Sequence, residues 1–355
     1  MNRTEGNTIR VLVVEDSRVV SEFITQVLNS DPNLEVVGTA ADGREALEAV
    51  QRMKPHVITM DIHMPHIDGF AATRNIMEIC PTPIVIVSGS STGDQVSTNF
   101  HALEAGALAV VARPQGVGHI HHFESAKALI DTVKLMSEVK VVRRWLRPKT
   151  EPVPAYTPQR LPTFSQMAIE IVAIGASTGG PLVLQTILAD LPKDLPVPIV
   201  IVQHMTPGFT QGFVEWLCYS TGFPVTVAKE GELLLPGHAY VAPDNVQMGV
   251  TNGRRIVLTR DARENGMCPA VSFLFRSINA NFGPRAVGVL LTGMGVDGVI
   301  ELNQLKNTGA VTLVQDKESS VVHGMPGQAI KDGAATHILS PLAIARALKT
   351  INSKS

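Results

Sequence analysis

The serine at position 177 lies between glycines, directly after an apolar run. Residues 175–180 read GASTGG, follow the predicted strand Ile169–Ile174, and lead through Pro181 into a helical pattern. The spacing Gly-x-Ser-x-Gly is typical of a nucleophile on a sharp strand-to-helix turn, because the glycines leave room for the hydroxyl and for a substrate. Ser177 is therefore a candidate nucleophile.

A serine hydroxyl needs a base, usually a histidine that is held by a carboxylate. His204 follows the predicted strand Ile199–Gln203, and Asp297 lies in the glycine-rich loop after the predicted strand Ala286–Leu291. Backbone N–H groups of that loop could form an oxyanion hole, worth roughly 3–4 kcal/mol per donor. The order Ser, His, Asp differs from that of the α/β-hydrolases, so the residues predict a triad without predicting that fold.

The same turn could instead grip a nucleotide phosphate. The dinucleotide pattern G-x-G-x-x-G fails because Ser177 occupies the place of the second glycine, and the Walker lysine is absent. A histidine such as His204, taken alone, is more often a satisfied core residue than a base. Its place at a strand end, beside a glycine-flanked serine, favours the catalytic interpretation.

Three carboxylates end two predicted strands in the first half of the chain. Glu15 and Asp16 follow Ile9–Val14, and Asp61 follows Val57–Met60. Neighbouring parallel strands end at the same edge of a sheet, so these like charges require a cation, and an all-oxygen ligand set suits Mg²⁺. A carboxylate beside Mg²⁺ can accept a phosphoryl group as an aspartyl-phosphate.

Two further polar residues end the next predicted strands. Ser88 follows Ile84–Val87 and could donate a hydrogen bond to a phosphoryl oxygen, while Arg113, after Leu108–Ala112, could pair with the phosphoryl charge. The alternative is that each acid merely caps a strand end. A metal role is also conceivable for two histidine groups, which are His63 with His66, and His119 with His121 and His122.

All these residues depend on parallel strands that end at one edge. Between residues 9 and 132, short β-branched runs, including one at Leu34–Thr39, alternate with helical patterns. They predict five βα units in a doubly wound parallel sheet. The second half is also α/β, with buried strands and one hairpin predicted at 169–174, 199–203, 286–291 and 311–314, and across 239–250 and 255–259. In such sheets, functional residues gather at the carboxyl ends of the strands.

A proline-rich segment, residues 147–165, divides the chain. It contains prolines at 148, 152, 154, 158 and 162, which favour an extended, semi-rigid linker. We therefore expect one domain over 1–146 and another over 166–355. A length of 355 residues fits two domains.

Composition excludes several classes of protein. The formal net charge of -2 lacks the basic excess of a nucleic-acid binder. Three scattered cysteines, Cys80, Cys218 and Cys268, argue against a disulfide scaffold or a thiolate zinc site and fit a reducing cytoplasm. No apolar stretch approaches the 18 or more residues of a membrane span, so we expect no membrane insertion.

Residues 9–132 resemble the receiver domain of bacterial response regulators. The resemblance rests on the pair Glu15 and Asp16, on Asp61 in MDIHMP with DG following, on Ser88, and on a basic residue before Pro114. It implies that Asp61 is the phosphoacceptor, and that Glu15, Asp16, Asp61 and the Ile62 carbonyl surround Mg²⁺. Receivers carry lysine where this chain has Arg113, whose guanidinium is a planar fork and not a compact ammonium.

The whole chain resembles the chemotaxis response regulator protein-glutamate methylesterases (the CheB family). Five blocks carry this resemblance in order, AIGASTGG from 173, QHMTPGFT from 203, LPGHAYVAP from 235, LTGMGVDG from 291 and VVHGMP from 321. It implies a parallel-sheet α/β methylesterase domain whose triad is Ser177, His204 and Asp297. The Met294 backbone N–H is implied as an oxyanion donor, and ester hydrolysis is implied to need no cofactor.

The implied activity is hydrolysis of glutamyl methyl esters on chemoreceptors, with release of methanol and with deamidation of glutamines. The unphosphorylated receiver is implied to inhibit, and a histidine kinase to donate phosphate. Residues 267–272, MCPAVS, depart from the expected HRPSVD type, which predicts a difference in substrate affinity or target. An esterase with a target outside chemotaxis and a non-catalytic binding protein remain alternatives.

Overall fold

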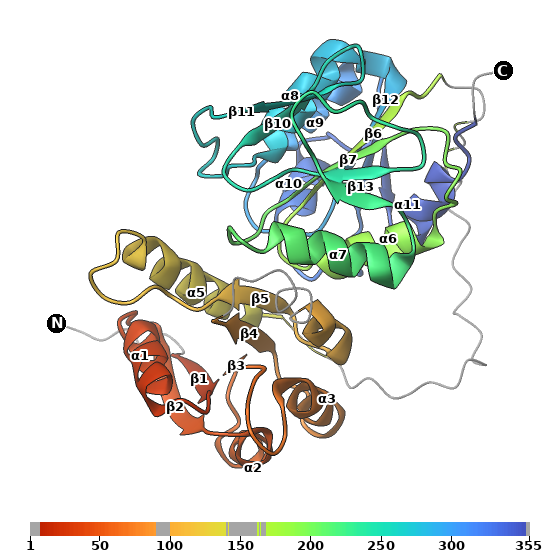
Figure 1. Cartoon of the computed structure of the whole chain (residues 1–355). Helices are drawn as coiled ribbons and strands as arrows, with labels where there is room; N and C mark the ends of the chain where they lie inside the picture. The colour runs from red at the N-terminus through yellow and green to blue at the C-terminus, as the bar shows by residue number, and fades with distance from the viewer. Residues whose placement is uncertain are drawn as a thin grey trace, which may run out of the picture. The chain divides into compact units, whose positions relative to one another are not determined.

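The computed structural model describes residues 8–89, 100–139, 141, 162, 164 and 168–352. The chain divides into two compact units, Met1–Pro154 and Ala155–Ser355, and each is a layered α/β fold (Figure 1). The division falls inside the predicted linker 147–165, of which only residues 162 and 164 are described. The predicted linker bounds therefore stay a prediction.

The first unit contains a five-stranded parallel sheet in the order β2-β1-β3-β4-β5. This is the flavodoxin-like order of doubly wound folds, which confirms the predicted fold class. Residues 100–105 are also helical. The other elements are β1 (Ile9–Val14), α1 (Arg18–Asn29), β2 (Leu34–Ala40), α2 (Gly43–Met53), β3 (Val57–Met60), α3 (Gly69–Ile79), β4 (Ile84–Ser88), β5 (Ala109–Ala112) and α5 (His122–Ser137).

Burial explains why these segments form strands and helices. Every residue of β3 and β4 is buried, as expected for central parallel strands that helices cover on both faces. Helix α1 buries Ser21, Ile24, Val27 and Leu28, which recur at the spacing of one helical face. Because β1 pairs with β3, the residues that follow these two strands lie at one edge of the sheet.

The second unit contains a seven-stranded sheet in the order β14-β13-β12-β6-β7-β9-β8, in which every strand pair is parallel. A short 3₁₀ helix, η1, spans Gly283–Arg285. The other elements are β6 (Ile171–Ala176), α6 (Gly180–Asp190), β7 (Ile199–Gln203), α7 (Thr210–Thr221), β8 (Val225–Val227), β9 (Ala239–Val241), β10 (Gln247–Val250), β11 (Ile256–Thr259), α8 (Val271–Asn281), β12 (Ala286–Leu290), α9 (Val299–Asn307), β13 (Val311–Gln315), α10 (Met325–Lys331), β14 (His337–Leu339) and α11 (Pro341–Leu348).

The predicted hairpin across 239–250 and 255–259 is wrong in its first arm. Residues 239–241 form β9, which pairs with β7 and β8 in the main sheet, and only 247–250 pair with β11. Pro243 and the left-handed Asn245, with φ of 59°, interrupt the run between them. Proline cannot donate to a strand ladder, and a left-handed residue turns the chain.

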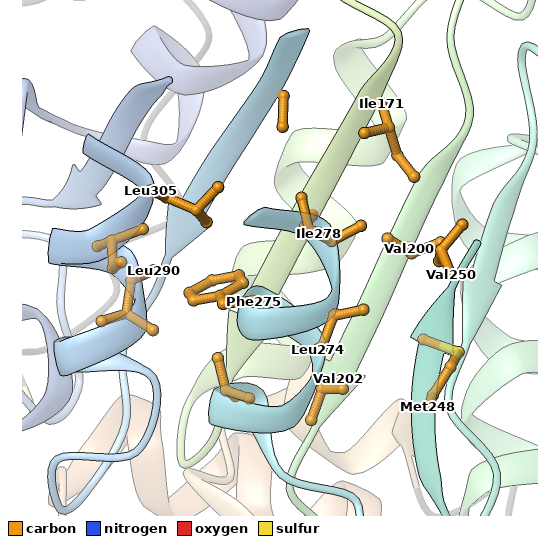
Figure 2. Close-up of a cluster of buried hydrophobic side chains, with 14 of the residues drawn as sticks. Ile171, Val200, Val202, Met248, Val250, Leu274, Phe275, Ile278, Leu290 and Leu305 are labelled. Carbon is orange, nitrogen blue, oxygen red and sulfur yellow. The ribbon is translucent and has the colours of Figure 1, made fainter. Parts of the chain in front are cut away.

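Alternate residues of the central strands build the core of the second unit. Figure 2 shows Ile171 of β6, with Val200 and Val202 of β7, facing Leu274, Phe275 and Ile278 of α8. Strand β6 lies between β7 and β12, so the chain leaves three adjacent strands at residues 176, 203 and 290. Within the described ranges, no helix is long and apolar enough to cross a membrane.

Candidate active site and phosphoacceptor site

Ser177 occupies the turn between β6 and α6. It directly follows Ala176, the last residue of β6, and its exposed fraction is 8%. Gly179, at the N-cap of α6, has φ of 80°, a left-handed conformation that glycine adopts without strain. The turn thus has the predicted strand-to-helix geometry.

Gly175 serves a different purpose from the one that the motif suggests. It lies within β6, and a Cβ at this position would approach Cγ1 of Val271 to 2.3 Å. Gly298 also lies against that valine, because a Cβ there would lie 2.4 Å from the same Cγ1. The two glycines therefore let the beginning of α8 approach the sheet closely.

His204 and Asp297 form a buried pair. Nε2 of His204 lies 3.0 Å from Oδ2 of Asp297, and the side chains are 7% and 4% exposed. The other ring nitrogen of His204, Nδ1, is buried and has no hydrogen-bond partner in the described part of the chain. Nδ1 is thus the nitrogen that is available to act as a base.

The backbone ties the three strand ends together. The N–H of Ser177 donates to the Thr292 carbonyl, which follows β12, at 3.0 Å. The side-chain amide of Gln203 donates to the carbonyls of both Ser177 and His204, at 2.8 Å each. Gln203 is 5% exposed and was not among the predicted site residues.

Four donors surround the carboxylate of Asp297. They are Nε2 of His204, Nδ2 of Asn265, and the backbone N–H groups of Val271 and Ser272. Burial raises the pKa of Asp297, but the hydrogen bond and charge of His204, together with hydrogen bonds from Ser272 and Asn265, hold this pKa at about 2. The carboxylate is therefore ionised at neutral pH and can fix the histidine ring.

The loop after β12 lies directly against the serine. A Cβ at Gly293 would come within 2.6 Å of the Cβ of Ser177, so only glycine fits there. The neighbouring N–H of Met294 has no acceptor among the described residues, and the N–H of Thr178 likewise has none. These two groups are candidate oxyanion donors.

Residues 267–272, which differ from the sequence expected for the family, bind the carboxylate of Asp297 through their backbone. The Cys268-Pro269 peptide bond is cis, and the N–H groups of Val271 and Ser272 lie 2.7 and 3.2 Å from the Asp297 oxygens. Ser272 Oγ also accepts from the N–H of Gly298 at 2.9 Å. The altered side chains therefore leave this support for Asp297 in place.

In the first unit, the three predicted carboxylates meet. Ligand oxygens of Glu15, Asp16 and Asp61 all lie within 4.8 Å of one another. Within the described ranges, this is the single group of three or more acidic, histidine or cysteine residues that could hold a metal, so neither histidine group forms such a site. The donor set fits Mg²⁺, which prefers carboxylate oxygens.

Arg113 partly neutralises this cluster. Its Nη2 lies 2.9 Å from Oε2 of Glu15 and 3.8 Å from Oδ2 of Asp61. Burial and then the charge of Asp61 nevertheless raise the pKa of Glu15 to about 7. Burial likewise raises the pKa of Asp61. The buried acids therefore still lack compensating positive charge.

Ile62 and Ser88 also lie at this edge. The N–H of Ile62 donates to Oδ1 of Asp61 at 2.8 Å, but its carbonyl, the predicted metal ligand, already accepts from Met64 and Gly69 at 3.2 and 2.9 Å. Since a carbonyl has two lone pairs, this one is engaged. Ser88 ends β4, is buried, and accepts through its carbonyl from the N–H of Arg113 at 2.7 Å.

Comparison with known families agrees with the division into two units. Residues 172–348 match the CheB methylesterase family, and residues 11–123 match the response regulator receiver domain. A protein-glutamate methylesterase/protein-glutamine glutaminase from Nitrosospira multiformis is 56% identical over 97% of each chain. The chain belongs to the CheB methylesterase family.

Other members of the CheB family are also close in sequence and structure. A Geobacter metallireducens protein, named protein-glutamate methylesterase/protein-glutamine glutaminase 4, is 54% identical over 97% of this chain and 99% of its own. The crystal structure of the Thermotoga maritima CheB methylesterase catalytic domain is 37% identical and covers 52% of this chain and 99% of its own, with a TM-score of 0.50. These matches agree with the α/β architecture of the second unit.

Proposed function

We propose that this CheB-family protein hydrolyses glutamyl methyl esters on chemoreceptors and that phosphorylation of Asp61 controls this activity. The observation that carries the proposal is the His204–Asp297 pair beside Ser177, at the ends of three adjacent strands. The names of the relatives that are 56% and 54% identical support the choice of substrate.

The geometry supports a role for each residue in this proposal. Because Nε2 of His204 binds Asp297, Nδ1 takes the proton of Ser177 while Oγ attacks the γ-carbonyl of the ester. The N–H groups of Met294 and Thr178 stabilise the oxyanion. Methanol leaves with the proton from Nδ1, and a water molecule, deprotonated at the same nitrogen, then hydrolyses the acyl-enzyme to glutamate.

The same site supports deamidation of receptor glutamines. An amide carbonyl passes through a similar tetrahedral intermediate, and His204 protonates the departing ammonia as it protonates methanol. The acyl-enzyme is identical in the two reactions, so its hydrolysis uses the same residues. Neither reaction requires a metal ligand set in the second unit.

In the receiver unit, Asp61 is the proposed phosphoacceptor, with a histidine kinase as the donor. Glu15, Asp16 and Asp61 would hold Mg²⁺, which supplies positive charge to the incoming phosphoryl group. We leave the Ile62 carbonyl out of the set, since it accepts two hydrogen bonds. The carbonyl of His63 accepts none from the described residues and is the better backbone candidate. Ser88 and Arg113 would bind the phosphoryl oxygens.

Methanol release from methylated receptor membranes tests the proposal, with and without acetyl phosphate and Mg²⁺. Ser177→Ala should lower the rate at least 10³-fold without loss of the thermal transition, since the serine supplies the nucleophile. Asp61→Ala should keep the basal rate and lose the increase on addition of acetyl phosphate. Near-wild-type turnover by Ser177→Ala would overturn the triad. A wild-type rate that is the same with and without acetyl phosphate would overturn the control of activity by Asp61 phosphorylation. No release by well-folded wild-type protein would overturn the choice of substrate.

A further inference from the structure

A two-residue hairpin lies beside the carboxylate of Asp297. The backbones of Glu264 and Met267 exchange two hydrogen bonds, of 3.0 and 2.7 Å, across Asn265 and Gly266. Both central residues are left-handed, with φ of 51° and 79°. Two positive φ values define a type I′ turn, for which Asn-Gly is the preferred pair. The turn therefore fixes the backbone of Asn265 in one conformation.

The side chain of Asn265 reaches from this turn to the triad. Its Nδ2 donates to Oδ1 of Asp297 at 3.1 Å and lies 3.3 Å from Oγ of Ser272. The backbone N–H of Ser272 is the second donor to Oδ1, while Oδ2 receives His204 and Val271. Each oxygen of the carboxylate thus has two donors, and Asn265 is the one that comes from an exposed loop.

Salt bridges fasten the hairpin to neighbouring helices. Arg276 of α8 lies 2.5 Å from Oε1 of Glu264 and 3.4 Å from Oε1 of Glu301 in α9. The hairpin is therefore attached to α8, whose first residues donate to Asp297, through an arginine that also pairs with α9. This attachment gives the amide a defined place relative to the carboxylate.

We propose that Asn265 is a positioning residue of the triad. By occupying Oδ1, it fixes the rotation of the Asp297 carboxylate so that Oδ2 faces Nε2 of His204. The ring then keeps Nδ1 free for Ser177. Asn265 acts through Asp297 and makes no contact with the reacting atoms. The inference rests on the proposed serine hydrolase function and deepens it.

Asn265→Gly tests the proposal, because glycine keeps the left-handed turn and removes the amide. Loss of a hydrogen bond to a charged group should lower kcat for methanol release about tenfold, with KM within twofold of wild type. Asn265→Asp also tolerates the turn but presents an acceptor to Asp297, so it should lower kcat further. The proton resonance of Nε2–H in His204 should shift in both variants, a change that a purely structural role would not cause.

Asn245→Gly is the matched control. Asn245 is also exposed and left-handed, with φ of 59°, but it is not among the four described donors to Asp297. It should keep wild-type kcat and the wild-type proton resonance. A wild-type kcat for Asn265→Gly, or an equal loss in Asn245→Gly, would overturn the proposal. Ser177→Ala is measured in the same assay to separate the two proposals. If Ser177→Ala is inactive while Asn265→Gly keeps wild-type kcat, only the role of Asn265 is wrong, and the proposed hydrolase function is unaffected.

Discussion

Nε2 of His204 lies 3.0 Å from Oδ2 of Asp297, and this contact determines which ring nitrogen remains for Ser177. Because the ionised carboxylate accepts a proton-bearing nitrogen, the neutral ring carries its hydrogen on Nε2 and its lone pair on Nδ1. Nδ1 is buried and without a partner in the part of the chain that the structure describes. The acid partner thus sets the tautomer of the base.

Asp297→Asn should disrupt that assignment. With the asparagine oxygen in the place of Oδ2, the amide N–H₂ would face the donors of Ser272 and Asn265, and in the opposite orientation it would face Nε2 of His204 and the N–H of Val271. We expect kcat for methanol release to fall about 10⁴-fold, as in other triads where the tautomer is lost. Steady-state kinetics check this, with phosphorylation by acetyl phosphate as a control for folding. A loss below tenfold would contradict the role of Asp297 in setting the tautomer.

The lowered pKa of Asp297 predicts a stability change in acid. The folded pKa is about 2, against an ordinary value of 3.8, so the stabilisation is fully present above pH 3.8 and is lost as pH falls towards 2. This shift corresponds to about 2 kcal/mol. Denaturant unfolding between pH 5 and 2 should therefore show that the wild-type loses about that much more stability than Asp297→Asn. Parallel pH curves for the two proteins would contradict the prediction.

Gly293→Ala should damage catalysis through packing alone. The added Cβ would approach the Cβ of Ser177 to 2.6 Å and Sδ of Met325 to 2.5 Å. The serine or the Met294 loop must then move, so we expect kcat to fall at least 10²-fold, since small displacements of catalytic groups cost this much. Gly253→Ala is the control, because its Cβ would meet only Oγ1 of Thr251, at 3.7 Å. Equal methanol release by the two variants would show that the loop tolerates the shift.

Glu15→Gln should stabilise the receiver unit at alkaline pH. The folded pKa of Glu15 is raised from 4.5 to about 7. The contribution of this group to the stability of the folded unit is therefore fully present below pH 4.5, and it is lost as pH rises through 7. We expect the Tm of the variant to exceed that of wild type at pH 8 and to match it at pH 4.5. Addition of Mg²⁺ at pH 8 should raise the Tm of wild type more than that of the variant.

Calorimetry without and with Mg²⁺ checks this expectation. Glu22→Gln, an exposed change on α1, is the matched control and should leave both comparisons unchanged. A lower Tm for Glu15→Gln than for wild type at pH 8 without Mg²⁺ would contradict the inference that the ionised Glu15 destabilises the receiver unit.

The edge of each sheet was predictable from sequence because the strands are short, apolar and parallel. Ser177, His204 and Asp61 each follow a fully buried strand, and Asp297 lies in the loop after another, so one rule about strand ends places each of them at the carboxyl edge of its own sheet. By contrast, β8 and β14 have three residues each, too few to show a period. They were therefore missed.

The supporting residues could not be predicted, because their roles depend on contacts between distant segments. Asn-Gly at 265–266 signals a turn, but nothing local places that turn against an aspartate 32 positions later. Gln203 lies in an apolar strand, yet its amide binds a carbonyl in the neighbouring β6 turn. The hydrogen bond from the N–H of Gly69, at the beginning of α3, to the Ile62 carbonyl was unpredictable for a similar reason.

The pairing of β6 with β12 has a consequence for newly made protein. Ile171 pairs with Ala286, a partner 115 positions later in the chain, and the Asp297 loop follows that second strand. Contacts so distant in sequence form late, because closing long loops costs entropy before the pairing compensates. A chain still emerging from the ribosome therefore carries Ser177 and His204 well before it acquires their acid partner. Ester hydrolysis is thus withheld until synthesis has passed β12, and recovery of activity during refolding would report the docking of that strand.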